Sequence, residues 1–168
     1  MARFEHFDTR RSKVTWTDAA AEAMREGAIF FDFIPDRPAI FEGRPVRIHL
    51  ATSPDPARPR ALAFSVDRAN AVLFVADSAR ARLGANVAAL EVVEDLVDRA
   101  DVPFVFLFNK RDVDGAVPVD ELREALRVLK APCFEGVIPE GTGTPALKGA
   151  LAAAFERHKS IVAAWKRR

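Results

Sequence analysis

The chain is poor in the residues that mark several functional classes. Its 168 residues include one cysteine, Cys133, which excludes an internal disulfide and a thiolate metal cluster. The three histidines lack the paired spacing of a metal site; they are His6, His49 and His158. Twenty-five basic residues against 24 acidic ones leave a net charge of +1, which predicts no nucleic-acid partner. No apolar run is long enough for a membrane span, and the first residues lack the apolar core of a signal peptide. We therefore expect a cytoplasmic protein without a metal, built as a single domain over residues 1–168.

The apolar pattern differs between the two halves of the chain. Ile29–Ile34 is rich in Phe and Ile, and residues 46–51 alternate apolar and polar side chains, so we expect these segments to form a hairpin. Residues 52–60 contain three prolines and should form a stiff loop. The second half predicts strands at residues 71–76, 103–108 and 134–138, with helices up to about residue 100, from residue 118, and at 145–165. Strands apolar on both faces that alternate with helices predict an α/β protein with a parallel sheet.

The most informative tetrapeptide is Asn109-Lys110-Arg111-Asp112, which directly follows an apolar run. Open α/β sheets bind ligands at the carboxyl ends of their strands. Guanine presents a ring N–H and an exocyclic amine side by side, and one carboxylate, such as that of Asp112, can accept from both. The stem of Lys110 can lie along the base, while Asn109 ties the loop to its neighbours. The alternative is a solvated loop after a strand.

An Asn-Lys-x-Asp motif at this place resembles the guanine-specificity motif of Ras-like GTPases. From Phe30 to Leu147 the chain is similar to the MglA-like family of bacterial gliding-motility GTPases; the similar stretches are FFDFIP (30–35), the strand end His49-Leu50, VLFVADS (72–78), ANVAALEVVEDL (85–96), NKRDV (109–113) and VDELREAL (119–126). The resemblance implies a Ras-like P-loop-GTPase-type fold, with a mostly parallel sheet and flanking helices. It also places the second base-reading loop at Gly141-Thr142-Gly143, and a remnant of the first strand at Lys13–Trp16.

The first part of the chain departs from this family. A phosphate-binding loop needs the pattern G-x-x-x-x-G-K-[ST], and the sequence contains no Gly-Lys pair. Residues 17–28 are too short for that loop, a first helix and a first switch together, and we expect a short Ala-rich helix ended by Gly27. The resemblance places the family's switch threonine on Ala28, its arginine finger on Gly27, and its second-switch Gly and Gln on Asp55 and Pro56. Neither pair can perform the family's chemistry: Ala28 has no oxygen for Mg²⁺, Gly27 has no charge for the transition state, and Pro56 cannot orient water.

These departures predict a pseudo-GTPase with no catalytic residues, no Mg²⁺, and a vestigial guanine site made of Asn109, Lys110, Asp112, Gly141, Thr142 and Gly143. A base site alone corresponds to about −4 kcal/mol, a dissociation constant near ~1 mM, so GTP and GDP should bind weakly or not at all. The prolines of the second-switch region further predict a protein fixed in one conformation. The resemblance implies a roadblock/longin-type regulatory partner in cell polarity or motility, which would engage a surface that includes Phe33, Arg47, His49 and Asp55.

Two alternatives stay open. The chain is either a true guanine-nucleotide binder whose phosphates are held by Arg10, Arg11, Lys13 or a partner chain, or a chain that lacks a segment present in an active parent. Other polar residues receive structural interpretations. We expect Asp77-Ser78 to be a packing and turn position and Arg80 and Arg82 to be solvated, while Cys133 should act as a small buried apolar side chain.

Overall fold

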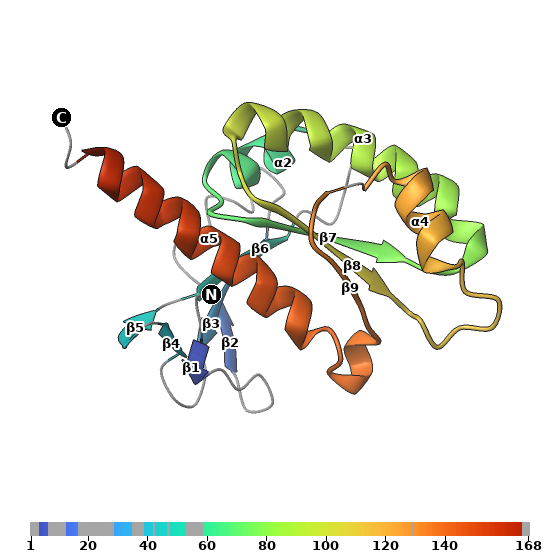
Figure 1. Cartoon of the computed structure of the whole chain (residues 1–168), viewed down its shortest axis with the longest axis horizontal. Helices are drawn as coiled ribbons and strands as arrows, with labels where there is room; N and C mark the ends of the chain where they lie inside the picture. The colour runs from blue at the N-terminus through green and yellow to red at the C-terminus, as the bar shows by residue number, and fades with distance from the viewer. Residues whose placement is uncertain are drawn as a thin grey trace. The chain divides into compact units, whose positions relative to one another are not determined.

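The computed structural model describes residues 4–6, 13–16, 29–34, 39–41, 43–46, 48–52, 59–128 and 130–165. The chain divides into two compact units, Met1–Arg68 and Ala69–Arg168. The first unit holds strands β1 to β6 and helix α2, and the second holds β7 to β9 with α3 to α5 (Figure 1). A single domain over the whole chain stays a prediction.

The first unit contains two antiparallel sheets of three strands each. One has the order β1-β4-β5 and the other β2-β3-β6; their strands are Phe4–His6, Ala39–Phe41 and Arg44–Val46, and Lys13–Trp16, Ile29–Ile34 and Ile48–Thr52. The predicted pairing is confirmed, because β3 lies antiparallel to β6 with Phe31 opposite Leu50. The bounds of the second strand differ at both ends: Val46 closes β5, and β6 begins at Ile48 and ends at Thr52. The intervening β4–β5 pair turns at Gly43, whose φ of +73° suits glycine.

The predicted loop at residues 52–60 is wrong at both ends. Thr52 closes β6, and Pro59 opens a helix, α2 (Pro59–Asp67), that the sequence analysis did not predict. Proline breaks a helix in its interior but favours the first position, where its missing N–H is not needed and its fixed φ is already helical. The remaining second-switch positions, 53–58, lie outside the described residues, as does the predicted helix within 17–28.

The second unit is a parallel sheet of three strands with helices. Strands β7 (Val72–Asp77), β8 (Phe104–Asn109) and β9 (Cys133–Glu135) pair in that order, all parallel. A 3-10 turn η1 (Arg80–Arg82) leads into α3 (Leu83–Ala100), and the later elements are α4 (Val119–Ala125), a 3-10 turn η2 (Ile138–Glu140) and α5 (Thr144–Trp165). The predicted α/β class is confirmed, and the three predicted helices of this half are present.

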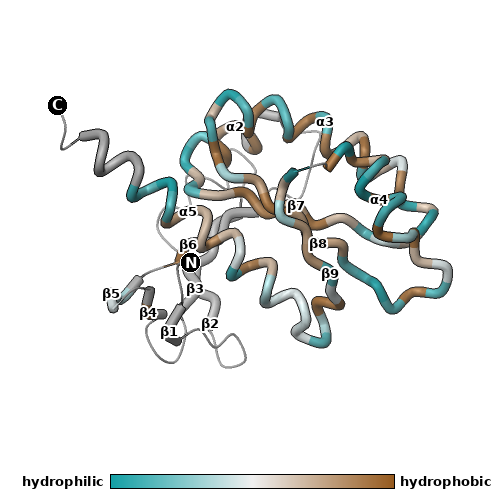
Figure 2. Tube along the Cα trace, in the orientation of Figure 1, coloured by the Kyte–Doolittle hydropathy of each residue, from teal (hydrophilic) through white to brown (hydrophobic). Residues whose placement is uncertain are grey.

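The core of this unit lies between the sheet and helices α3 and α4. Alternate residues of β7 and β8 point into it, with Leu90 of α3 and Leu122 of α4 packed against them; the strand residues are Phe74, Ala76, Phe106 and Phe108. Figure 2 shows both strands as mainly apolar before their polar last residues. The opposite face of β8 is also buried, at Val105 and Leu107, and α5 contacts all three strands. Both faces of β8 are therefore apolar and buried, as predicted, whereas β7 is apolar on both faces but leaves Val75 exposed.

The last strand is shorter than residues 134–138. It ends at Glu135, and the next residue, Gly136, lies so close to the following loop that an added Cβ would be 3.1 Å from the backbone of Thr142 and Gly143. Ile138, expected in the strand, belongs to η2. Cys133 is half-buried, its thiol contacts the Ala131 carbonyl at 3.4 Å, and burial raises its pKa, which agrees with a packing role. No helix within the described part of the chain is long and apolar enough to cross a bilayer.

Candidate functional site

The parallel strands of the second unit bring two polar strand ends together. Asp77, the last residue of β7, lies opposite Asn109, the last residue of β8. Beyond the strand ends, the segments that follow are also hydrogen-bonded: the Ser78 N–H donates to the Asn109 carbonyl at 2.9 Å, and the Val117 N–H donates to the Ser78 carbonyl at 2.8 Å. The Asn-Lys-x-Asp loop thus begins at the carboxyl edge of the sheet, where such sheets bind ligands.

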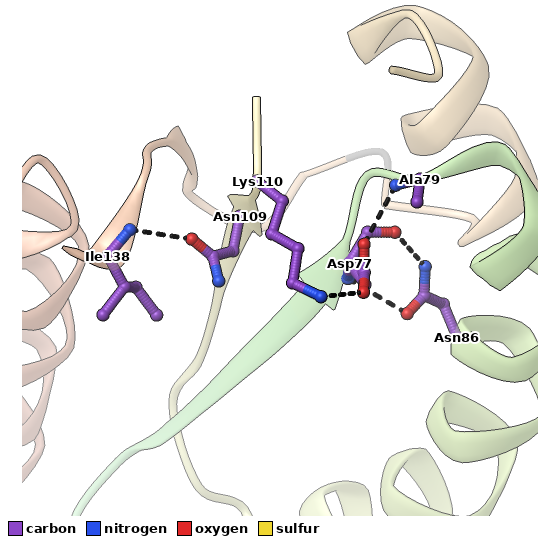
Figure 3. Close-up of polar contacts among 6 residues, drawn as sticks. All are labelled: Asp77, Ala79, Asn86, Asn109, Lys110 and Ile138. Atoms are coloured by element: carbon purple, nitrogen blue, oxygen red, sulfur yellow. Dashed lines mark hydrogen bonds and ion pairs between the residues drawn. The ribbon is translucent and has the colours of Figure 1, made fainter. Parts of the chain in front are cut away.

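Asn109 links its loop to the segment after β9. Its Oδ1 accepts a hydrogen bond from the Ile138 N–H at 2.9 Å (Figure 3). This contact fixes which end of the side-chain amide carries the nitrogen. The link that we expected of Asn109 is present, and its partner is η2 rather than Gly141-Thr142-Gly143. The base-reading role of that glycine-containing loop stays a prediction.

Lys110 reaches across to the neighbouring strand. Its Nζ lies 2.7 Å from Oδ2 of Asp77, and its own φ is +60°, a conformation that non-glycine residues adopt rarely (Figure 3). Asp77 also accepts a hydrogen bond from the Ala79 N–H at 3.0 Å. Partial burial raises the pKa of the Asp77 carboxyl, but these hydrogen bonds and the charges of Lys110 and Arg82 outweigh it, and the net pKa lies below its usual value. Asp77 is therefore ionised at neutral pH and compensates the charge of Lys110.

Asn86 of α3 holds the end of β7 in place. Its Oδ1 accepts from the Asp77 N–H at 3.1 Å, and its Nδ2 donates to the Asp77 carbonyl at 2.8 Å. The side chain is 8% exposed, so both of these hydrogen bonds are largely shielded from water. Asn86 thus holds the backbone of Asp77 in place, independently of the contact between the Asp77 carboxylate and Lys110.

Arg111 fastens the same loop on its other side. Its Nε lies 3.2 Å from Oε2 of Glu135 at the end of β9, and its Nη1 donates to the Val117 carbonyl at 2.6 Å. Its backbone N–H donates to the Gly136 carbonyl at 3.4 Å. Asp112, the next residue, is exposed and has no hydrogen-bond partner within the described ranges. Its carboxylate is exposed to solvent, on a loop that the contacts of Asn109, Lys110 and Arg111 hold in place.

The Gly141-Thr142-Gly143 loop closes on the residue before η2. The Thr142 hydroxyl accepts from the Val137 N–H at 2.6 Å, and Gly141 has a φ of +77°. The N–H groups of Thr142 and Gly143 have no acceptor among the residues that the structure describes. They are donors that a carbonyl oxygen of a ligand could use.

Sequence reasoning gave no site role to Asn86 or Ile138, and it gave Asp77 only a packing and turn position. Asp77 had a usable signal, because a polar residue ending each of two adjacent parallel strands predicts a shared edge. Ser78 is fully buried, as a packing position should be, but its hydroxyl has no hydrogen-bond partner in the described part of the chain. Arg80, expected to be solvated, is exposed but forms a two-pronged pair with Glu121 of α4, at 2.7 and 3.0 Å.

The predicted interaction surface lies elsewhere in the chain. In the β3–β6 pair, Phe33 is opposite Ile48, and His49 is opposite Asp32. Positions 33 and 49 therefore belong to successive residue pairs, and successive pairs lie on opposite faces of a sheet. Arg47 and Asp55 lie outside the described residues, as do Arg10, Arg11, Gly27, Ala28 and Pro56. Lys13 pairs with Ile34 in the β2–β3 ladder. In the described ranges, no three acidic, histidine or cysteine side chains group as a metal site would need.

Comparison with known proteins identifies the family. No family model matches the sequence. A curated relative, the mutual gliding-motility protein MglA of Myxococcus xanthus (strain DK1622), is 36% identical over 124 residues, which cover 68% of this chain. The match spans 62% of the relative, so this chain corresponds to less than two thirds of that protein's length. With the parallel sheet, and with the Asn-Lys-x-Asp loop at its carboxyl edge, this similarity shows that the chain belongs to the MglA-like gliding-motility family of Ras-like small GTPases.

Proposed function

We propose that this chain is a non-catalytic MglA-like protein that acts as a regulatory interaction module. One observation carries the proposal: the sequence has no Gly-Lys pair, while its Asn-Lys-x-Asp loop is held by an ordered set of contacts. A phosphate cradle, Mg²⁺ and an oriented water supply nearly all of phosphoryl-transfer catalysis. A chain that keeps the base-reading end of a nucleotide site and lacks the phosphate end should not hydrolyse GTP.

The positions that the family resemblance assigns to the reaction support the same conclusion. Ala28 has no oxygen with which to bind Mg²⁺, and Gly27 has no charge for the transition state. Pro56 has no side-chain amide with which to orient water. In Ras-like proteins, the metal ligand, the arginine and the water-orienting amide that these residues replace each contribute orders of magnitude to GTP hydrolysis.

Two measurements test the absence of catalysis. Denatured samples of the purified protein should release no carried-over guanine nucleotide, and hydrolysis of GTP with Mg²⁺ should be no faster with the protein than in buffer. The Asp112→Ala variant is the matched control, because a contaminating GTPase is unaffected by it. Hydrolysis that Asp112→Ala abolishes would overturn the proposal and favour a true GTPase whose phosphate site involves Arg10, Arg11 or Lys13.

The proposed partner is a regulatory protein of the roadblock/longin type. The family relationship supports this class of partner, and the proposed contact surface comprises the region of Phe33, Arg47, His49 and Asp55. A protein fixed in one conformation would bind such a partner without a nucleotide cycle.

Charge reversal tests this surface. Arg47→Glu and Asp55→Lys should each weaken co-purification with a roadblock-type partner. Glu94→Lys, an exposed charge reversal on α3, should leave co-purification unchanged and controls for altered net charge. Undiminished binding by both surface variants would remove the assigned surface.

A further inference from the structure

The outer edge of strand β7 is open in the described part of the chain. The sheet of the second unit has the order β7-β8-β9, so among the described strands β7 has a neighbour on one side only. The Val72 N–H donates to the Pro103 carbonyl just before β8, and in a parallel ladder every second residue faces the same neighbour. The N–H and C=O groups of Leu73 and Val75 therefore point away from β8, where no described strand pairs with them.

Asn86 closes this outward row at its carboxyl end. Asp77 is the next residue of the row, and its N–H donates to Asn86 Oδ1 at 3.1 Å while its carbonyl accepts from Asn86 Nδ2 at 2.8 Å (Figure 3). The side-chain amide of Asn86 thus takes the place that a peptide group of a neighbouring strand would take. The open part of the edge is therefore limited to the backbone groups of Leu73 and Val75.

This open edge lacks the features by which proteins protect exposed strands. Exposed edge strands are commonly short, or they carry charged residues or proline. At the other edge of the sheet, β9 has three residues, follows Pro132 and ends on Glu135. In contrast, β7 has six residues, and residues 69–76 contain neither a charge nor a proline. Val75 is also 45% exposed, whereas Leu107, opposite it in β8, is 2% exposed.

We propose that β7 pairs antiparallel with the β7 strand of a second copy of this chain. An antiparallel pair about a twofold axis at Phe74 places Leu73 of each copy opposite Val75 of the other. Each such pair exchanges both of its backbone hydrogen bonds, so the open groups of both edges are used. The side chains of the paired residues lie on one face of the joined sheet, where the leucine of one copy covers the exposed valine of the other. The contact involves no nucleotide and is additional to the regulatory surface proposed above.

The charges near this edge favour a second copy over a charged partner strand. Residues 69–76 hold no charge, so they offer nothing to attract a charged peptide. Asp77, the charged residue of β7, lies opposite Ala71 of the other copy in the antiparallel register. The two Asp77 carboxylates are thus at opposite ends of the contact, and each stays paired with Lys110. A parallel alignment of the two strands would instead bring the two carboxylates together, where like charges repel.

Sedimentation velocity and hydrogen exchange of the full chain test the association. Between about 10 µM and about 1 mM, the protein should pass reversibly from monomer to dimer, because a contact along one short strand is small and therefore weak. Exchange should slow at Leu73 and Val75 as the dimer forms, while the N–H groups of Phe74 and Ala76, which face β8, should be protected at both concentrations.

Three outcomes of these measurements overturn the inference. One is a protein that stays monomeric at the highest concentration. Another is a dimer in which exchange at Leu73 and Val75 is unchanged, because the contact would then lie elsewhere. The third is slow exchange at these two positions in the monomer, because the edge would then be covered within one chain.

Val75→Lys tests the place of the contact. A lysine on an edge strand opposes pairing, and dimerisation should weaken by at least about tenfold. The fold should be retained, because Val75 is 45% exposed. Val92→Lys is the matched control, since Val92 is a valine of similar exposure, 38%, on α3, and this variant should dimerise like the wild type. Equal dimerisation of the wild type and Val75→Lys overturns the inference.

A charge swap tests the antiparallel register. Val75 of one copy is a diagonal neighbour of Val75 of the other, at a distance that long side chains can bridge. Val75→Glu should therefore be as weak a dimer as Val75→Lys, whereas an equimolar mixture of the two variants should associate more strongly than either variant by itself. A mixture that associates no better than its components overturns the register and, with it, the inference. If either variant fails to fold, the exchange measurement on the wild-type protein decides the question by itself.

Discussion

Gly149 of α5 lies against an aromatic ring of the sheet. A Cβ built at this glycine would be 2.8 Å from Cε2 and Cζ of Phe134, closer than non-bonded carbon atoms approach one another. Phe134 belongs to β9, and α5 contacts that strand. The glycine therefore sets how closely the helix packs on the sheet, at the expense of the helix propensity that alanine would provide.

Gly149→Ala should destabilise the protein by about 1–2 kcal/mol, because the overlap with Phe134 outweighs the gain in helix propensity. Denaturant unfolding measures the change. Gly84→Ala is the matched control, since Gly84 is also helical but has nothing within 4 Å of its added Cβ, and it should stabilise the protein. In a Phe134→Leu background, Gly149→Ala should lose most of its effect. Equal effects in both backgrounds would contradict the clash.

The residues of the candidate site were predictable only where they lie together in the sequence. Asn109, Lys110 and Asp112 form one tetrapeptide, and their position after a buried strand was correct. Asp77 reaches the same edge from the neighbouring strand β7, and Ile138 reaches it from the 3-10 turn η2, so their contacts depend on strand pairing and on the path of the chain after β9, which the tetrapeptide does not contain. The ion pair between Lys110 and Asp77 follows from that pairing and has no sequence pattern of its own.

At the scale of elements, long periodic segments were predictable and short or proline-marked ones were not. The apolar repeats of α3 and α5 predict the end of α3 and both ends of α5 within a residue or two, whereas α3 begins at Leu83, after the 3-10 turn η1. Strands β4 and β5 have three residues each, too few for an alternation to stand out. Helix α2 was missed because Pro59 was read as part of a loop, although proline also favours the first turn of a helix.

Helix α3 ends on a residue in a left-handed conformation. Asp101 has a φ of +50°, and its N–H donates to the carbonyls of Val97 and Asp98. Arg157 of α5 then donates to the carbonyls of Asp101 and Ala100, at 2.6 and 2.9 Å. These contacts satisfy backbone carbonyls at the C-terminal end of α3. Asp101 itself is unfavourable there for two reasons: the left-handed conformation costs free energy in a residue with a Cβ, and its negative charge lies beside the negative end of the helix dipole.

Asp101→Gly should stabilise the protein relative to Asp101→Ala by about 1 kcal/mol. Both variants remove the charge, and glycine alone relieves the left-handed backbone. For a domain of this size the difference corresponds to roughly 2–4 °C in melting temperature, measurable by calorimetry. Equal stability of the two variants would mean that the end of α3 relaxes to another conformation.

At the scale of the whole molecule, the structure and the sequence analysis differ in the number of compact parts into which they divide the chain. The structure divides into two compact units after Arg68, whereas the length and the family resemblance predict one domain. The first unit has 68 residues with two small antiparallel sheets; a domain of that size buries only about 60% of the surface that its unfolded chain exposes, and its stability alone is marginal. The core built around Leu122 belongs to the second unit.

The two tryptophans allow cooperativity to be measured, because each unit contains one: Trp16 in β2 and Trp165 in α5. Trp165→Phe leaves fluorescence that reports on the first unit, and Trp16→Phe leaves fluorescence that reports on the second. If the chain folds as one domain, both should unfold at the same denaturant concentration. Adding Leu122→Ala, at a residue that is 0% exposed, should remove about 2–5 kcal/mol and lower both midpoints together. A midpoint that moves only for Trp165 would mean that the units unfold independently, because the loss of a side chain from the second core would then leave the stability of the first unit unchanged.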